Sequence, residues 1–287
     1  MQARSARAVI NSSASHVFDV LRFICTWPVP LGVTEISRQL KLPASTVYRA
    51  LITLEEADYI RRYRNTPRFE LAPTPHLLNR ALFSRFELHH ASRPLMRSLA
   101  QATGETVSLW ARLGWFALRI GGAFGSRDVY HRARLGETRL LHEGAAASVI
   151  LAELSEADLA SYRRFVDKHF PERRPDAGWD AQAQDLRLVR TRGFATIPLP
   201  MAPGFDAVAI PIRNESGHPV ASIMLDGPVL RSGEAELDPC ALQARDDLEV
   251  MIALDPAAFL SPFAHIPADG LLIRTPSTSD TETGGSG

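Results

Sequence analysis

The segment LGVTEISRQLKLPASTVYRALITLEEADYIRRY, residues 31–63, decides the fold of the N-terminal part of the chain. Its apolar residues recur every three or four positions, which predicts a short helix over 32–40 and a longer helix over 44–57. The turn Lys41-Leu42-Pro43 separates the two helices, because proline does not continue a helix from within. An apolar stripe that precedes this segment predicts another helix over 15–26.

Two short extended runs follow the third predicted helix. They predict strands over 59–63 and 68–71, joined by the turn Arg64-Asn65-Thr66-Pro67. Three helices followed by a hairpin are the order of a winged helix-turn-helix, and the last helix of a helix-turn-helix enters the major groove of DNA. We therefore expect a DNA-binding domain over residues 10–75.

The composition of the 287-residue chain fits a globular protein of about two domains. Hydrophobic residues make up 45% of it, and no apolar run approaches the roughly 18–20 residues of a membrane span. The N-terminus lacks the continuous apolar stretch of a secretory signal. Cys25 and Cys240 are far apart, which argues against a disulfide framework and against a cysteine metal knuckle. These features predict a cytoplasmic protein that has no membrane partner.

The charges are unevenly distributed, although the whole chain is neutral with 32 basic and 32 acidic residues. Residues 1–97 contain fourteen Lys and Arg against seven Asp and Glu, and the remaining 190 residues contain eighteen against twenty-five. A basic head on an acidic body indicates a nucleic-acid-binding module joined to a second domain. Chance segregation of charge is the alternative. Nearly all basic residues are Arg, so the number of arginines alone does not indicate phosphate binding.

The rest of the chain predicts a helical linker over 76–92 and a second domain over 93–262, which begins with a helix at Arg93-Pro94. The expected strands cover 106–112, 115–120, 207–213 and 219–225, and the expected helices cover 145–154, 156–169, 179–193 and 241–254. This alternation predicts an α+β domain with a mostly antiparallel sheet. The chain ends in the polar run TPSTSDTETGGSG, so we expect 263–287 to be a disordered tail.

Residues 31–63 resemble the DNA-binding half of IclR-type bacterial transcriptional regulators. That family typically reads T-E-I-A, a turn ending in L-P, then S-T-V-x-R-x-L-x-x-L-E and a G-Y-V-x-R wing strand. Three later segments are similar, in the same order, to the family's effector-binding domain: RPLMRSLAQATGETVSL (93–109), RARLGETRLLHEGAAASVILA (132–152) and RGFATIPLPMAPGFDAVAIPIRNESGHPVASIMLDGP (192–228). The resemblance covers roughly residues 10–262.

The resemblance implies a ligand-responsive repressor or activator with a GAF-like C-terminal domain. Its partners are then a double-stranded DNA operator and a small-molecule effector, and it acts as a homodimer or as a dimer of dimers. Lys41 departs from the family pattern, because the turn between the second and third helices commonly has Gly there. A left-handed backbone at a lysine is strained.

The candidates for DNA contact lie on the predicted helices and on the wing. Four of them share the exposed N-terminal part of the third helix: Ser45, Thr46, Tyr48 and Arg49. Such side chains bind base edges, and Arg pairs with guanine through two hydrogen bonds; the alternative is a solvated helix face capped by Ser45. We expect Thr34 to cap the second helix and to meet a phosphate. On or beside the wing, we expect Arg64 and Arg68 to contact the DNA backbone or minor groove.

The candidates for effector binding come from the resemblance. The positions that match the family's pocket are Ala145, Ala146, Ile197, Ala207, Met224 and Asp226, and Leu109 and Leu199 are candidates for an apolar cleft. Small residues at the start of a helix let a ligand approach the backbone amides, which is a recurrent way of holding an anion. Plain packing of the helix on the sheet is the alternative for the alanines, as core packing is for the leucines.

Several of these positions are more apolar than is usual in the family. Ile197, Leu199, Pro200 and Met224 predict an aromatic or other bulky catabolite rather than a glyoxylate-sized acid. Asp226 repels an anionic effector unless it is protonated, points outward, or is paired with an arginine such as Arg132 or Arg134. The alternative is that these side chains fill the pocket and leave a regulator without an effector.

The sequence does not indicate an enzyme, a cofactor or a metal site. His142-Glu143 lacks the second histidine of H-E-x-x-H, and Gly121-Gly122-Ala123-Phe124-Gly125 lacks the G-x-G-x-x-G spacing. Two function classes remain: a ligand-responsive transcription factor, and an interaction or sensor module whose effector domain has lost its ligand. Salt-dependent binding to duplex DNA distinguishes the first from the second.

Overall fold

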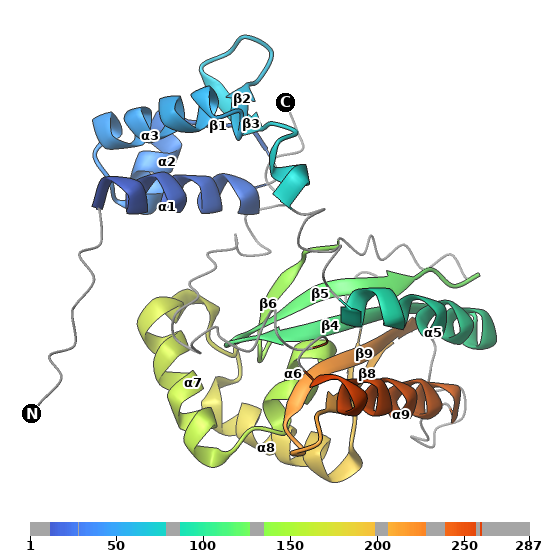
Figure 1. Ribbon diagram of the computed structural model, residues 1–287. Helices are drawn as coiled ribbons and strands as arrows, with labels where there is room; N and C mark the ends of the chain where they lie inside the picture. The colour runs from blue at the N-terminus through green and yellow to red at the C-terminus, as the bar shows by residue number, and fades with distance from the viewer. Residues whose placement is uncertain are drawn as a thin grey trace, which may run out of the picture. The chain divides into compact units, whose positions relative to one another are not determined.

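A computed structural model of the chain describes residues 12–27, 29–78, 87–126, 135–198, 206–227 and 239–256, together with residue 259. The described residues up to 78 form one compact unit, and those from 87 onward form a second (Figure 1). The predicted tail over 263–287 and residues 79–86 of the predicted linker lie outside the described residues. In the part of the chain that is described, no helix is long and apolar enough to cross a membrane.

The first unit is the predicted winged helix-turn-helix. Its elements are α1 (Ser12–Thr26), β1 (Leu31–Gly32), α2 (Val33–Leu40), α3 (Ala44–Glu56), β2 (Ile60–Arg62) and β3 (Arg68–Leu71). The three strands form an antiparallel sheet in the order β1-β3-β2, so β3 pairs with both of the others. The two-residue strand β1 was not predicted, because a run that short has no periodicity to read.

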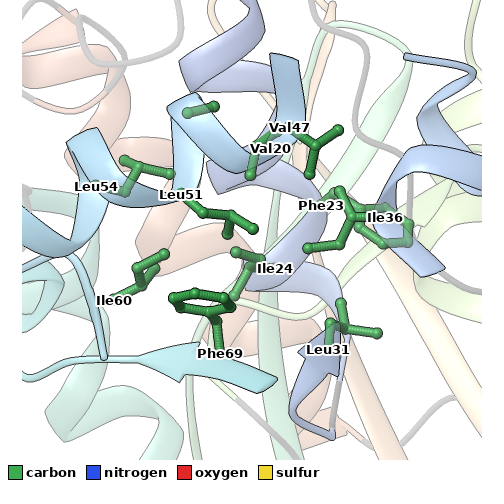
Figure 2. Close-up of a cluster of buried hydrophobic side chains, with 11 residues drawn as sticks. Val20, Phe23, Ile24, Leu31, Ile36, Val47, Leu51, Leu54, Ile60 and Phe69 are labelled. Atoms are coloured by element: carbon green, nitrogen blue, oxygen red, sulfur yellow. The ribbon is translucent and has the colours of Figure 1, made fainter. Parts of the chain in front are cut away.

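One hydrophobic core joins all six elements of this unit. Figure 2 shows its side chains, which come from α1 (Val20, Phe23, Ile24), β1 (Leu31), α2 (Ile36), α3 (Val47, Leu51, Leu54), β2 (Ile60) and β3 (Phe69). Each is at most 7% exposed, and burying one such side chain contributes about 1.5–3 kcal/mol. The core therefore fixes the orientation of α3 and leaves its other face in solvent.

The second unit is an α+β domain around a six-stranded antiparallel sheet. Its strands are β4 (Thr106–Leu113), β5 (Phe116–Ala123), β6 (Thr138–Leu140), β7 (Ala195–Pro198), β8 (Asp206–Arg213) and β9 (Pro219–Gly227). They lie in the order β6-β5-β4-β9-β8-β7. The helices are α5 (Glu87–Thr103), α6 (Ala145–Ala152), α7 (Glu156–His169), α8 (Gly178–Arg192) and α9 (Pro239–Leu254). The predicted α+β architecture and antiparallel pairing are confirmed.

The alternation of side chains along β4 fixes which residues face which helix. Ser222 lies opposite Trp110, and its Oγ donates to the carbonyl of Ala146 at 2.7 Å, so this row of the sheet faces α6. On the opposite face, a Cβ added to Gly121 would lie 3.5 Å from the His89 ring of α5. Helices α5 and α9 lie side by side and pack against the sheet (Figure 1).

The predicted helix boundary at Arg93-Pro94 is wrong, because α5 continues through Pro94. Pro94 has no N–H to donate to the carbonyl four residues earlier, which weakens the helix at that turn. The buried face of α5, formed by Leu88, Met96 and Leu99, packs against the domain on both sides of the proline. Tertiary packing therefore outweighs the local preference for a break.

Lys41 ends α2 in the left-handed region, with φ 54° and ψ 38°. Its N–H donates to the carbonyl of Ser37, so the residue closes the helix as a glycine commonly does. The strain that the sequence predicts for a lysine in this conformation is thus present in the turn between α2 and α3.

Replacing Lys41 by Gly should raise the free energy of unfolding of the first unit by about 0.5–1 kcal/mol, because glycine adopts positive φ without strain. The matched control is Ala57→Gly at the end of α3, where φ is −87°; this change should lower stability by a similar amount. Urea unfolding of the full chain measures both. A destabilised Lys41→Gly variant would contradict the strain argument.

Candidate DNA interface and effector site

The exposed face of α3 carries the predicted recognition residues. Ser45 and Arg49 are exposed, Tyr48 is 49% exposed, and Thr46 is half-buried. The carbonyl of Pro43 accepts the first hydrogen bonds of the helix, so Ser45 is not its cap. No ion pair within the described residues engages Arg49, and its guanidinium is thus available for a ligand in solution. This face can donate hydrogen bonds to base edges.

The predicted cap at the start of α2 is corrected by the structure. Gly32 is the N-cap residue, and its N–H donates to Oε2 of Glu35 at 2.7 Å. Thr34 lies inside the first turn with an exposed side chain. Its hydroxyl and the positive end of the helix dipole still suit a phosphate, so the predicted phosphate contact remains a prediction.

The tip of the wing is a turn with two left-handed residues. Arg64 has φ 46° and Asn65 has φ 59°, a pair of positive values that fits a tight hairpin. The guanidinium carbon of Arg64 lies 5.1 Å from the centre of the Tyr63 ring. The side chain is exposed, and no ion pair among the described residues holds it. It therefore extends a free positive charge at the wing tip.

Arg68 differs from Arg64, because the protein itself uses its guanidinium. Its Nη2 pairs with Oε1 of Glu35 at 2.7 Å, and its Nε donates to the carbonyl of Pro30 at 3.0 Å. These bonds tie β3 to α2 and to the residue before β1. The predicted DNA contact by Arg68 remains a prediction, but its geometry favours a structural role and makes Arg64 the better candidate.

Most of the predicted effector-binding positions share one face of the large sheet. Ile197, Ala207 and Asp226 lie side by side in a row that continues to Thr106. Met224 lies in the next row, and the row after that contains Ser222, which binds α6. Ala145 and Ala146, both buried, begin α6 above this face. The structure therefore brings together six of the eight predicted residues.

The other two predicted residues do not join this face. Leu109 is adjacent to Trp110 in β4 and pairs with Gly121 and Ile223, so its side chain points to the α5 side of the sheet. It is fully buried there and belongs to the core. Leu199 lies outside the described residues, as do Pro200, Arg132 and Arg134. The outward orientation considered for Asp226 is excluded, because its side chain is 0% exposed.

Sequence reasoning missed three residues of this face: Trp110, Arg119 and Arg139. Arg119 is opposite Trp110 in β5, and its guanidinium carbon lies 5.8 Å from the centre of the Trp110 ring. The guanidinium of Arg139 lies 5.2 Å from the same ring. The available signal was the position of Arg119 inside the apolar run Phe116-Ala117-Leu118-Arg119-Ile120, since arginine is almost never fully buried without a reason.

The electrostatics around Arg119 are set by burial. Removal from water lowers the pKa of its guanidinium from the ordinary value, and Arg139 acts in the same direction. The carboxylates of Asp226 and Glu137 act in the opposite direction and favour the charged form. Glu137 also pairs with Arg139 at 2.7 Å. Two arginines and two carboxylates therefore interact at this part of the sheet, and one of them, Arg139, lies against Gly144 at the start of α6.

The start of α6 is held by a buried polar network. Nδ1 of His142 lies 2.6 Å from the hydroxyl of Tyr162, and Nε2 lies 2.8 Å from the carbonyl of Arg173. Burial lowers the pKa of His142, so a neutral ring that donates to the carbonyl and accepts from the tyrosine fits this geometry. Gly144 caps the helix with φ 82°, and a Cβ there would collide with the guanidinium of Arg139.

The face does not have the composition of a metal centre. In the described part of the chain, no three His, Cys, Asp or Glu side chains are close enough to hold a metal ion. What the face offers a small molecule is the apolar side chains of Ile197, Ala207 and Met224, the first amides of α6, and charged groups from β5 and β9. The first amides of a helix have no carbonyl partner within it and bind acceptors readily.

Comparison with known proteins finds relatives over most of the chain. Residues 13–64 match the IclR helix-turn-helix domain, and residues 80–247 match the C-terminal domain of the bacterial transcriptional regulator IclR. The chain is 30% identical over 210 residues to HTH-type transcriptional regulator BhcR of Paracoccus denitrificans (strain Pd 1222). The aligned region covers 72% of this chain and 74% of BhcR.

Two solved structures share the fold. One is an IclR family transcriptional regulator from Brucella abortus, with a TM-score of 0.70, 21% identity, and coverage of 85% of this chain and 94% of that one. The other is an IclR homolog complexed with 4-hydroxybenzoate from Microbacterium hydrocarbonoxydans, with a TM-score of 0.62, 19% identity, and coverage of 83% and 98%.

Replacing Arg68 by Ala should lower the free energy of unfolding of the first unit by about 1 kcal/mol, because the pair with Glu35 and the bond to Pro30 are lost from a partly exposed site. Arg64→Ala is the matched control and should change stability by less than about 0.5 kcal/mol. Thermal unfolding of the full chain measures both variants. Equal stability of the two would show that the Arg68 bonds do not hold the wing.

Proposed function

The chain belongs to the family of IclR-type bacterial transcriptional regulators, and we propose that a small-molecule effector with a substantial apolar part controls its affinity for a DNA operator. As a member of this family it is a DNA-binding transcriptional regulator with an effector-binding C-terminal domain. The observation that carries the proposal is one face of the large sheet in the second unit. Four of the matched positions, Ile197, Ala207, Met224 and Asp226, lie on this face, and α6, which begins with Ala145 and Ala146, packs against it.

We assign sequence reading to the exposed start of α3 and backbone contact to α2 and the wing tip. The geometry supports Ser45, Thr46, Tyr48 and Arg49 as base-contacting candidates, with Thr34 and Arg64 as phosphate-contacting candidates. A single winged helix reads few base pairs, and two copies on adjacent half-sites double the contacts. A homodimer or a dimer of dimers therefore fits a transcriptional regulator of this size.

The apolar side chains on the candidate effector-binding face of the second unit support an effector with a ring or another bulky apolar body. Ala207 and Met224 are buried on the face, and Ile197 is half-buried beside them. Burying an aromatic ring of roughly 100 Å² contributes about 2.5 kcal/mol before ordering costs. The Microbacterium hydrocarbonoxydans homolog was solved with 4-hydroxybenzoate, which is an aromatic compound of this kind.

Arg49→Ala should lower the affinity for a duplex selected from a random library by about 1–3 kcal/mol and relax the base preference at one position. Arg64→Ala should weaken binding to all duplexes alike and reduce the salt slope by about one unit, because it removes a phosphate contact. Arg187→Ala, an exposed arginine on α8, is the control. Fluorescence anisotropy against salt concentration measures all four proteins. A uniform loss in both variants would mean that α3 positions the protein without reading sequence.

Benzoate and 4-hydroxybenzoate should raise the melting temperature of the full chain and change its affinity for the selected duplex, whereas acetate and glyoxylate should not. A ligand that binds the folded domain stabilises it by mass action, and the two short acids have little apolar area to bury. A thermal-shift series followed by anisotropy tests this. Binding of glyoxylate without any response to the aromatic compounds would refute the apolar effector. No response to any small molecule, together with DNA binding that does not depend on salt, would favour the interaction-module alternative.

A further inference from the structure

The wing, which consists of β2, β3 and the turn between them, carries four arginines, and the protein itself engages three of them. The engaged pairs are Arg61 with Glu70 at 2.8 Å, Arg62 with Glu55 at 3.2 Å, and Arg68 with Glu35 at 2.7 Å. Arg64 is exposed at the tip, and no ion pair among the described residues holds it. The use of this charge on DNA therefore depends on where the tip lies.

The tip of the wing extends beyond the hydrophobic core of the first unit. Phe69 of β3 is 1% exposed and belongs to that core, whereas the turn 64–67 contains no buried residue. The N–H of Tyr63 donates to the carbonyl of Arg68 at 2.8 Å and closes the turn. Arg68 thus lies between the core and the tip, where an attachment of its side chain restricts the tip directly.

Glu35 of α2 attaches Arg68 to the start of its own helix. Oε1 of Glu35 accepts from Nη2 of Arg68 at 2.7 Å, and Oε2 accepts from the N–H of Gly32 at 2.7 Å. Nε of Arg68 donates to the carbonyl of Pro30 at 3.0 Å. Gly32 and Arg68 also lie opposite each other in the pairing of β1 with β3. The base of the tip is therefore fixed to the first turn of α2, which packs against α3.

This attachment suits orientation better than stability. The side chains of Arg68 and Glu35 are 43% and 37% exposed, and water weakens an ion pair that is exposed to this degree. Two hydrogen bonds from one guanidinium nevertheless restrict the direction of the strand that carries it. A segment that is already ordered loses less conformational freedom on binding, and this saving appears as affinity.

We propose that Glu35 is a positioning residue for DNA binding, because through Arg68 it holds the wing tip where Arg64 meets the DNA backbone while the start of α3 reads the bases. This inference rests on the proposed function, in which Arg64 contacts a phosphate. It gives Arg68 an indirect role in place of the direct DNA contact that the sequence predicts.

The test is Glu35→Gln in the full chain, measured by fluorescence anisotropy on the selected duplex. Gln also serves at this position of a capping box, so the bond to Gly32 is kept while the ion pair with Arg68 is lost. Removal of a carboxylate near DNA should by itself tighten binding, whereas loss of positioning should weaken it. We expect the affinity to fall about three- to tenfold, the cost of ordering one or two side chains on binding.

Glu70→Gln is the matched control. It removes the same charge from the same sheet, but the pair of Glu70 with Arg61 joins β3 to β2 and leaves the attachment to α2 intact. The affinity of this variant should equal or exceed that of the wild-type protein.

A second measurement separates positioning from a general loss of stability. Arg64→Ala should cost a smaller factor in affinity in the Glu35→Gln background than in the wild-type background, because an unpositioned Arg64 contributes less. Arg68→Met should weaken binding as Glu35→Gln does, with little further loss when the two are combined. Arg68→Lys keeps the charge without the fork and should retain part of the affinity. Thermal unfolding shows which variants are folded at the assay temperature, and if Glu35→Gln is not, Arg68→Lys takes its place in the cycle with Arg64→Ala.

Three results would overturn the inference: Glu35→Gln that binds as tightly as the wild-type protein or more tightly, an equal loss from Arg64→Ala in both backgrounds, or a full further loss from Arg68→Met in the Glu35→Gln background, which would indicate direct contact of Arg68 with DNA. Absence of salt-dependent duplex binding by the wild-type protein would overturn the proposed function as well. Salt-dependent binding that Glu35→Gln leaves intact overturns the positioning role alone.

Discussion

The register of β4 against β9 is the constraint on which the second unit depends. Trp110 lies opposite Ser222, and Ser222 is bound to the first turn of α6. Because side chains alternate along a strand, a slip of β9 by one residue would turn Met224 and Asp226 away from α6 and bring Ile223 toward it. The bond from Ser222 to Ala146 is buried, so a slip would also leave the Ser222 hydroxyl without this acceptor. The same register that packs the core therefore decides which residues share the candidate effector-binding face.

The charged residues of this face are kept at a cost to stability. A buried ion pair rarely contributes more than the apolar residues that could replace it, and a buried donor without a partner is unfavourable. Arg119 and Asp226 are 3% and 0% exposed. Packing elsewhere, such as the contacts of Phe116 with Phe165 and Phe170, supplies the stability that permits them. Sites held in this way are expected where binding requires a prearranged charge.

The architecture could be predicted from the sequence, because each long element has a strong pattern and its own punctuation. The α7 prediction over 156–169 matches the helix in the structure, where Ser155 caps its start. Short elements such as β1 and β7 have too few residues to show a period. The site could be predicted only in part. The family match located the face, but whether Leu109 or Trp110 points toward α6 depends on pairing between strands that are more than 100 residues apart. The role of Arg68 was likewise hidden, since its partner Glu35 is distant in the sequence.

Helix α6 packs on the candidate effector-binding face and connects it, through hydrogen bonds and ion pairs, to other elements of the second unit. All eight of its residues are buried, so it cannot shift without moving its neighbours, which are packed as densely as a crystal. The C-terminal end of α6 is held by two arginines. Arg190 of α8 donates to the carbonyls of Ala152 and Leu154. Arg213 of β8 forms a bidentate ion pair with Glu153. At the N-terminal end of α6, Gly144 lies against Arg139, which shares the Trp110 ring with Arg119. Because α6 is buried along its whole length, a displacement at Gly144 would be transmitted along the helix to the contacts that Arg190 and Arg213 make at its far end. A ligand bound at the start of α6 could shift the helix only by its difference in affinity for the two positions of the helix.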